Sequence, residues 1–380
     1  MADLPTERLD RAEVRWAGKQ LAKRKLLWSD EAAPEIRHIF HVANAWRDAH
    51  NFPMVRIRAQ TIGQLNRMQL RGRLTAARLK RLPSIRKKLE KRYLDVIQDL
   101  AGVRVILPTL RDVERLAEAC RLGLPHEIYN TDDYIAVPRP SGYRSLHLML
   151  KYKAANRFEE VVEGCRVELQ LRTRRQHGWA TAVEAVGLFR GEALKSGQGD
   201  PDWLRLFLLM ASETARIEGR PEVPGAPDHA DRVRELRDLN ARLKAASFLD
   251  GISQAVDYTK RYVRAPGSEV YLIRFDMQTH EVSLVGYSSS AAGSRAYHAM
   301  ERDGDQFDAV LVTTDSVNNL VQAFPNYFGD TRMFAKTLRQ VIKGRDVPEF
   351  VLPDQEMVRA APRAPADMSW LRRATRSRSI

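Results

Sequence analysis

One short segment constrains the fold of this chain more than any other part of its sequence. Between residues 167 and 173, apolar and polar side chains alternate: Val167, Leu169 and Leu171 against Glu168, Gln170 and Arg172. This alternation predicts a β-strand with one face buried in a core and the other face open. A carboxylate, an amide and a guanidinium then share the open face. That face is suited to chemistry, although an ion pair between Glu168 and Arg172 is a simpler interpretation.

A loop that could hold a nucleotide precedes this strand. Residues 132–147 form an extended segment that is interrupted between residues 138 and 142 by prolines and a glycine, so we expect two strands joined by a loop. Tyr143 offers a flat ring on which a base can stack, and Arg139 and Arg144 suit planar recognition of phosphate. A tyrosine that only completes the turn is the alternative.

A strongly basic segment, residues 71–92, lies further upstream. Ser84 is predicted to cap a short helix, with Arg78 and Lys80 before the cap and Lys88 one turn inside it. An anion at this helix N-terminus would meet free amide hydrogens and the three cationic side chains together. The spacing alone is equally typical of a basic helix on the protein surface.

An acidic residue stands at the start of a predicted buried strand. Asp99 comes directly before the apolar run 100–107, which contains Gly102. A carboxylate at a strand end beside a glycine is a reasonable Mg²⁺ ligand, because a ligand can approach closely there. A turn or capping residue is the more common role for such an aspartate.

Three of these segments together resemble the synthetase region of RelA/SpoT enzymes. They are the runs Gln-Asp-Leu-Ala-Gly-Val-Arg at 98–104, Gly-Tyr-Arg-Ser-Leu-His at 142–147 and Val-Glu-Leu-Gln-Leu-Arg-Thr at 167–173, with His177 beyond. Members of that family move the β,γ-pyrophosphate of ATP onto a 3′-hydroxyl. The resemblance therefore implies an ATP-dependent pyrophosphokinase.

The resemblance also implies roles for individual residues. Asp99 and Glu168 would be the catalytic pair that holds Mg²⁺, and Glu168 would accept the proton of the attacking hydroxyl. The other residues fall into an ATP-binding group (Arg78, Lys80, Ser84, Lys88 and Arg172), an acceptor-binding group (Arg139, Tyr143, Arg144 and His147) and a supporting group (Gln170 and His177).

Composition narrows the class of protein. The chain carries 62 Lys and Arg against 48 Asp and Glu, and the net charge of +14 favours an anionic partner such as RNA or nucleotide phosphates, although a basic C-terminal tail contributes to it. Two cysteines exclude a disulfide scaffold and a four-cysteine zinc site. With no apolar leader and no membrane-length apolar run, we expect a cytoplasmic protein.

The predicted fold is α+β, with a mixed sheet flanked by helices and a small C-terminal α+β domain. The expected division is an N-terminal helical segment (1–70), a RelA/SpoT-like pyrophosphokinase domain (71–218), a linker and helical arm (219–250), a C-terminal regulatory, antitoxin-like domain (251–344) and a basic tail (345–380).

The C-terminal part resembles the neutralising domain of CapRel-type fused toxin–antitoxins. This resemblance depends on the run Phe-Pro-Asn-Tyr-Phe at 324–328, in which Phe324 replaces the tyrosine of that family. The resemblance implies that Phe324 and Tyr327 block the ATP site until a phage protein releases them. Both aromatic residues could equally belong to the core of the small domain.

Three functional hypotheses follow from the sequence. The first is a translation-inhibiting toxin of phage defence that uses ATP to pyrophosphorylate the 3′-CCA end of tRNA. The second is a small alarmone synthetase that makes (p)ppGpp from GDP or GTP. The third is a catalytically inactive nucleotide or RNA sensor. A stacking tyrosine does not separate the first two, because every base has a π-face.

Overall fold

The computed structural model of the chain describes residues 4–23, 33–257, 261–263, 270–276, 282–302, 307–313 and 331–348. All of these residues lie within one compact unit, residues 1–350.

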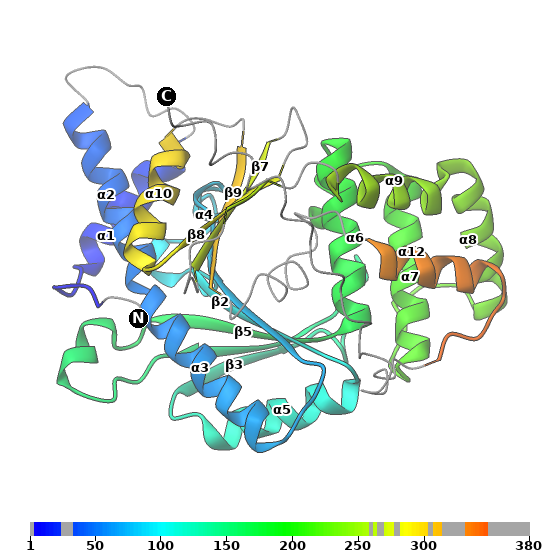
Figure 1. Cartoon of the computed structure of the whole chain (residues 1–380), viewed down its shortest axis with the longest axis horizontal. Helices are drawn as coiled ribbons and strands as arrows, with labels where there is room; N and C mark the ends of the chain where they lie inside the picture. Colours follow the sequence, from blue (N-terminus) through cyan, green and yellow to red (C-terminus); the bar gives the residue numbers. More distant parts are fainter. Residues whose placement is uncertain are drawn as a thin grey trace, which may run out of the picture. The chain divides into compact units, whose positions relative to one another are not determined.

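Nine strands in the described part of the chain form one mixed sheet (Figure 1). Their order across the sheet is β3-β4-β5-β2-β1-β9-β7-β8-β6. The strands are β1 (Leu74–Leu79), β2 (Ala101–Leu107), β3 (Glu127–Asp133), β4 (Leu146–Lys151), β5 (Arg166–Thr173), β6 (Arg261–Val263), β7 (Val270–Asp276), β8 (Val282–Tyr287) and β9 (Phe307–Thr313).

Helices connect and cover these strands. The α-helices are α1 (Arg11–Ala22), α2 (Ala33–Ala49), α3 (Asn51–Arg67), α4 (Leu82–Leu89), α5 (Leu110–Gly123), α6 (Arg174–Arg190), α7 (Pro201–Ile217), α8 (His229–Leu243), α9 (Ala245–Asp257), α10 (Ser290–Arg302) and α12 (Arg332–Ile342). Short 3₁₀ turns occur at Leu94–Val96, Arg157–Val162 and Leu194–Ser196.

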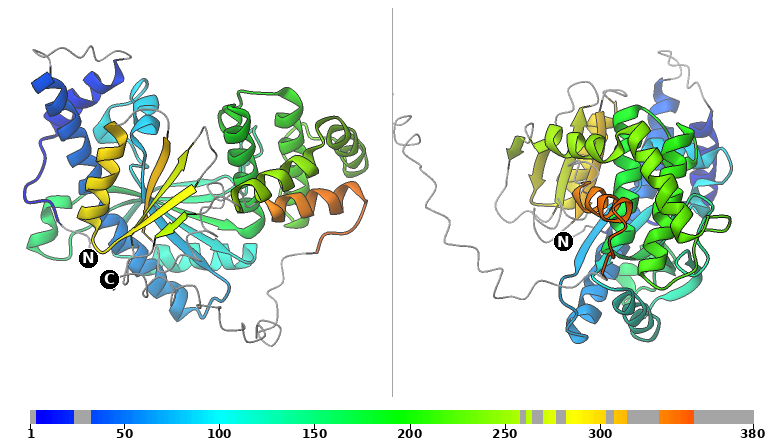
Figure 2. Two further views of the ribbon diagram at one scale, coloured as in Figure 1. Left: turned by 45° about the horizontal axis from the view of Figure 1, so that its top comes forward. Right: turned by 90° about the vertical axis from the view of Figure 1, so that its right-hand side faces the viewer.

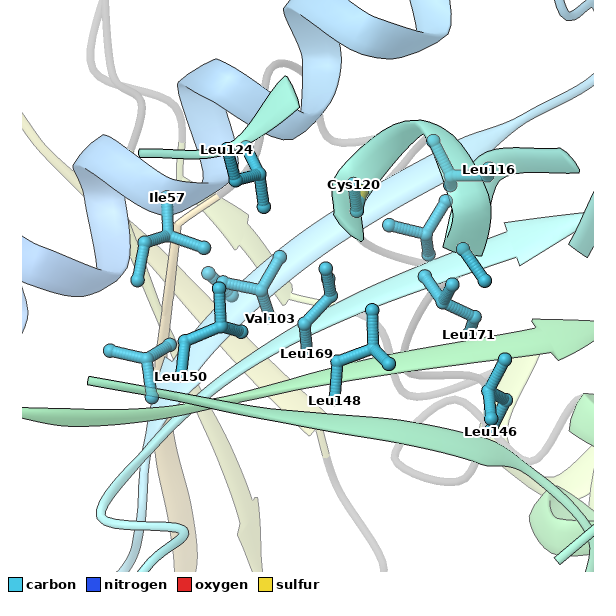
Figure 3. Close-up of a cluster of buried hydrophobic side chains, with 14 of the residues drawn as sticks. Ile57, Val103, Leu116, Cys120, Leu124, Leu146, Leu148, Leu150, Leu169 and Leu171 are labelled. Atoms are coloured by element: carbon cyan, nitrogen blue, oxygen red, sulfur yellow. The ribbon is translucent and has the colours of Figure 1, made fainter. Parts of the chain in front are cut away.

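The alternating segment is a half-buried strand, as the sequence predicts. It is β5, which pairs in parallel with β2 and antiparallel with β4. Val167, Leu169 and Leu171 are fully buried on one face of the sheet. There they meet apolar side chains of α3 and α5 in one continuous cluster (Figure 3). Burial of this face fixes the register, since a slip by one residue would turn the polar set into the core.

The opposite face of β5 therefore presents its polar residues beside α6. This helix starts directly after the strand, with Thr173 as N-cap and a reciprocal capping box between Thr173 and Gln176. Towards its end, Leu188 and Phe189 pack against apolar residues of β1, β2 and the C-terminal strands. The sheet face is thus polar near β5 and apolar near β9.

Two helical layers complete the described structure. Helices α6, α7, α8, α9 and α12 share a second apolar cluster, and Figure 2 draws these helices next to one another. Helices α1, α2 and α4 share another cluster. A hydrogen bond of 2.9 Å from Arg15 Nε to Asp95 Oδ2 ties α1 to the turn before β2.

The predicted fold class is confirmed, and two features differ from the sequence prediction. Residues 74–79 form strand β1, a segment for which no element was predicted. The C-terminal strands also continue the same sheet, because β9 pairs with β1 through Ala77–Thr313 and Arg78–Val312. The domain boundaries proposed above remain a prediction. No helix in the described ranges is both long and apolar enough to cross a bilayer.

A buried histidine makes the stability of this fold depend on pH. His126 Nδ1 accepts a hydrogen bond of 3.1 Å from the Lys153 amide, and Nε2 lies 2.7 Å from Gln60 Oε1. Burial, aided by the charge of Arg56, lowers the pKa of His126 from 6.5 to about 4. The unfolded chain therefore binds a proton at a higher pH than the folded chain does. This contribution to stability is complete above about pH 6.5 and is lost as the pH falls towards 4.

We expect the thermal midpoint to fall between about pH 7.5 and pH 5, with His126 contributing on the order of 2 kcal/mol to the loss. His126→Asn, which keeps an acceptor for Lys153, should show a smaller fall. His41→Gln, at an exposed position of α2, should behave like the unaltered chain. Equal falls in all three proteins would show that His126 is not responsible.

Candidate active site

Asp99 lies just before the first residue of β2 and is contacted by two lysine side chains. Its Oδ2 atom accepts hydrogen bonds from Lys80 Nζ at 2.7 Å and from Lys88 Nζ at 2.8 Å. Its buried Oδ1 atom has no hydrogen-bond partner in the structure. Burial by itself would raise the pKa of Asp99, but the charges and hydrogen bonds of the two lysines outweigh it and hold the pKa at about 2. The carboxylate is therefore ionised at neutral pH.

Glu168 is the second carboxylate of the site, and both of its oxygens are engaged. Oε1 lies 2.8 Å from His147 Nδ1, and Oε2 accepts a short hydrogen bond from Gln170 Nε2. Burial opposes ionisation, yet the bonds from His147 and Gln170 leave the pKa of Glu168 below its usual value. The charge of Asp99 acts in the opposite direction on the same pKa.

This carboxylate pair fits Mg²⁺. The ion takes oxygen ligands, keeps several waters and is bound in nucleotide sites by one or two carboxylates together with substrate phosphates. Asp99 Oδ1 is a buried oxygen without a partner, which is the atom such an ion would satisfy. Among the described residues no group of three or more His, Cys, Asp or Glu side chains converges, so the protein itself would supply few ligands.

Three arginines face the same side of the sheet as Glu168. In the strand register, Arg78 on β1 is opposite Gly102, and Arg104 on β2 is opposite Gln170. Burial, together with the charges of Arg172 and Arg78, lowers the pKa of Arg104 to about 9, so its guanidinium is still protonated at neutral pH. Guanidinium groups that repel one another in a partly buried place are suited to receive a polyanion.

Tyr143 is held beside the carboxylate by two hydrogen bonds. Its hydroxyl accepts from Arg172 Nη2 at 2.5 Å and lies 3.0 Å from His147 Nε2. The Arg172 guanidinium also lies over the Tyr143 ring, 5.1 Å from the centroid. The edge of Trp179 supports the ring, with the centroids 6.5 Å apart. The structure therefore brings Tyr143 into the same cluster as Glu168.

Comparison with known proteins finds a match over the segment that contains these residues. A sequence profile described as the region found in RelA / SpoT proteins matches residues 77–190. The chain contains a RelA/SpoT region. This region runs from β1 to the last turn of α6 and includes the carboxylate pair, Arg78, Arg104 and Tyr143.

The chain is also similar to curated proteins over about a third of its length. The GTP pyrophosphokinase YwaC of Bacillus subtilis is 32% identical over 122 residues, which are 30% of this chain and 56% of that protein. The GTP pyrophosphokinase YjbM of the same organism is 30% identical over 133 residues, 34% of this chain and 58% of that protein. The matched segment thus spans little more than half the length of these relatives.

Solved structures of small alarmone synthetases show a partial likeness. Synthetase 2 from Bacillus subtilis aligns over 45% of this chain and 90% of its own, with 22% identity and a TM-score of 0.39. Synthetase 1 from Bacillus subtilis, bound to its product pppGpp, aligns over 38% and 73%, with 22% identity and a TM-score of 0.33.

One detail of the predicted phosphate-binding helix is wrong. Helix α4 begins at Leu82 rather than after Ser84, and its N-cap is Arg81 in an extended conformation. Pro83 belongs to the first turn, where its missing N–H costs no hydrogen bond, so the helix starts before the serine. Ser84 is therefore a residue of the first turn. Its role in ATP binding remains a prediction.

Arg144 does not occupy the position that its predicted role requires. It is buried, and its Nη1 and Nη2 atoms donate to the carbonyl oxygens of Ile135 at 2.9 Å and Pro221 at 2.5 Å. A guanidinium used in this way clamps the loop to the segment after α7. Arg139 is exposed instead and stacks on Tyr134, with 4.3 Å between Arg139 Cζ and the ring centroid. It remains the candidate for acceptor contact in this loop.

The other predicted residues are placed as follows. His177 is buried on the first turn of α6, and its supporting role remains a prediction. Phe324 and Tyr327 lie outside the described residues.

Two contributors to the site were not predicted from the sequence. Arg104 belongs to the motif at 98–104 but was given no role. Its position two residues after Gly102 places both residues on the same face of β2. Ser145 is fully buried and accepts a hydrogen bond of 3.3 Å from Arg172 Nε. No sequence signal marks Ser145, because the contact depends on the pairing of β4 with β5.

Proposed function

We propose that this protein is an ATP-dependent pyrophosphokinase that transfers the β,γ-pyrophosphate of ATP to the 3′-hydroxyl of a nucleotide, with GDP or GTP as acceptor. The observation that carries the proposal is that two carboxylates, five cationic side chains and one aromatic ring gather at the polar side of β1, β2 and β5 and the segments next to these strands. The cations are Arg78, Lys80, Lys88, Arg104 and Arg172.

The chemistry needs each part of this set. Transfer requires a polyanion held in line with a hydroxyl, charge neutralised on the moving group and a place for the hydroxyl proton. Mg²⁺ held by Asp99 and Glu168 would neutralise charge on the ATP phosphates. Arg78, Lys80 and Lys88 would bind the remaining phosphate oxygens. Glu168, ionised at neutral pH, would accept the proton of the 3′-hydroxyl.

The acceptor side is formed by the loop before β4. Tyr143 would stack on the acceptor base, with His147 and the exposed Arg139 near its sugar and phosphates. Curated relatives with 30% and 32% identity are described as GTP pyrophosphokinases, which favours GDP or GTP. Their names are the reason for preferring this acceptor, since a tyrosine face alone accepts any base.

A second candidate acceptor is the 3′-CCA end of tRNA. The net charge of +14 over the whole chain favours a polyanionic partner larger than a nucleotide. Under this alternative the protein is a translation-inhibiting toxin of the CapRel type, restrained by its C-terminal part and released by a phage protein. The residues predicted for that restraint are outside the described part of the chain.

The acceptor assay separates these proposals. The full chain is incubated with Mg²⁺ and ATP labelled in its γ-phosphate, in parallel with GDP, GTP, tRNA ending in CCA and tRNA lacking the terminal adenosine. Label in GDP and GTP supports the preferred proposal. Label in intact tRNA alone would replace it by the second. Absence of label from every acceptor, with Mg²⁺-dependent ATP binding retained, would favour a nucleotide sensor.

A further inference from the structure

Two chains of hydrogen bonds connect Arg172 with Glu168. One runs from Arg172 Nη2 to the Tyr143 hydroxyl at 2.5 Å, then to His147 Nε2 at 3.0 Å, and from His147 Nδ1 to Glu168 Oε1 at 2.8 Å. The other runs from Arg172 Nη2 to Gln170 Oε1 at 3.0 Å and from Gln170 Nε2 to Glu168 Oε2. The two chains close a ring of five side chains, which we call the Glu168 ring.

The direction of each bond in the Glu168 ring follows from the chemistry of its ends. Arginine can only donate, so the Tyr143 oxygen and the Gln170 carbonyl are acceptors from Arg172. An ionised carboxylate can only accept, so His147 Nδ1 and the Gln170 amide are donors to Glu168. In the tautomer that has its only ring proton on Nδ1, Nε2 is the acceptor and the Tyr143 hydroxyl is its donor. Each of the five links of the ring then joins one donor to one acceptor.

The Glu168 ring lies in a buried environment, where hydrogen bonds are stronger than in water. Glu168, His147 and Arg172 are each less than a tenth exposed. In a partly dry environment hydrogen bonds polarise one another along a chain, and an unpaired polar group is costly. Loss of one link should therefore loosen the next group rather than only its direct partner.

We infer that Tyr143 is a positioning residue for Glu168. Its hydroxyl, acting through His147, fixes the orientation of the carboxylate, in addition to any stacking of its ring on a base. His147 is the intermediate of this action, in addition to its proposed place near the acceptor. The expected effect of this positioning on kcat rests on the proposed function. The hydrogen bonds themselves can be tested in the absence of any reaction.

Kinetics can separate the hydroxyl of Tyr143 from its ring. Tyr143→Phe keeps the stacking surface and removes the link to His147. Because loss of a group that orients an active residue costs about 10- to 100-fold, we expect kcat to fall by that factor, with the KM of the acceptor changed less than about twofold. Tyr143→Ala should raise this KM as well. An unchanged kcat in Tyr143→Phe would overturn the inference.

The matched control is Tyr129→Phe. The Tyr129 hydroxyl is buried on β3 and has no hydrogen-bond partner in the structure, so its removal breaks no bond of the ring. Its kcat and KM should equal those of the unaltered chain. A fall as large as that of Tyr143→Phe would show that loss of any nearby hydroxyl is harmful, and would count against the inference.

A double-mutant cycle tests whether His147 transmits the effect. In His147→Asn the amide nitrogen can replace Nδ1 as donor to Glu168, but nothing replaces Nε2 as partner of Tyr143. This variant should retain more activity than His147→Ala. Adding Tyr143→Phe to His147→Asn should have little further effect, since the link is already broken. Additive losses would mean that Tyr143 and His147 act separately.

Nitrogen-15 NMR of the full chain, labelled at histidine, examines the ring without any turnover. The His147 signals are identified by their absence in His147→Asn. We expect the proton on Nδ1, and we expect the Nε2 signal to move in Tyr143→Phe but not in Tyr129→Phe. A proton on Nε2 with Nδ1 unprotonated would overturn the inference. A chain that labels no acceptor but shows the Nδ1 proton would refute the proposed function alone.

Discussion

Replacement of Glu168 by glutamine is expected to abolish pyrophosphate transfer while the fold remains intact. The substitution removes the charge and the proton acceptor together, and removal of a general base typically costs 10²- to 10⁴-fold in rate. We therefore expect the labelling rate of the acceptor to fall by about 10³-fold or more. The new amide can still accept from His147, so the thermal midpoint should change by only a few degrees.

The control for this experiment is Glu160→Gln, at an exposed position within the Arg157–Val162 turn. It should transfer at the rate of the unaltered chain. Retention of more than about a tenth of the activity in Glu168→Gln would rule out the proposed base. If the protein acts in cells without transfer, as the sensor hypothesis requires, Glu168→Gln should keep its cellular effect.

Asp99→Asn is expected to have the second-largest effect, because Asp99 would act on both the metal and the lysines. It provides the buried oxygen that fits Mg²⁺ and also neutralises Lys80 and Lys88. Loss of one ionic contact to developing charge costs about 10²- to 10³-fold in kcat. We expect a fall of that size, together with a higher Mg²⁺ concentration for half-maximal activity.

A double variant separates the two contributions of Asp99. If neutralising the lysines stabilises the site, Asp99→Asn combined with Lys80→Gln should have a higher thermal midpoint than Asp99→Asn, because the uncompensated cation is gone. Activity should not recover in the double variant, because Lys80 itself would bind phosphate and the oxygen that fits the metal is still missing. Asp238→Asn, at an exposed position of α8, serves as the control and should leave the Mg²⁺ dependence unchanged.

Periodicity was sufficient to predict the core of this fold. The alternation around Glu168 identifies the buried face of β5, and the apolar run before α5 identifies β2, because burial on one or both faces leaves a regular pattern. Strand β1 was missed, since Arg78 and the lysines after it conceal a short apolar strand within a basic segment. Its place depends on pairing with β2, which local sequence does not encode.

The sequence predicted which residues belong to the candidate site better than it predicted which of them are in contact. Asp99, Glu168 and Tyr143 were identified through motifs, and the structure brings them together. Arg144 is chemically as suitable for phosphate as Arg139. Only the fold shows that Arg144 is buried against the carbonyl of Pro221, far along the chain. The hydrogen bonds around Glu168 likewise join residues of two strands and a loop, so sequence spacing could not reveal them.

Strand β1, which carries Arg78, pairs with β9, a strand that is synthesised much later. Translation places Arg78 in the nascent chain long before Val312, the residue that pairs with it, leaves the ribosome. Until then β1 has an open edge, which a nascent protein would need to keep from pairing wrongly. Completion of this side of the sheet therefore awaits synthesis of the chain through β9.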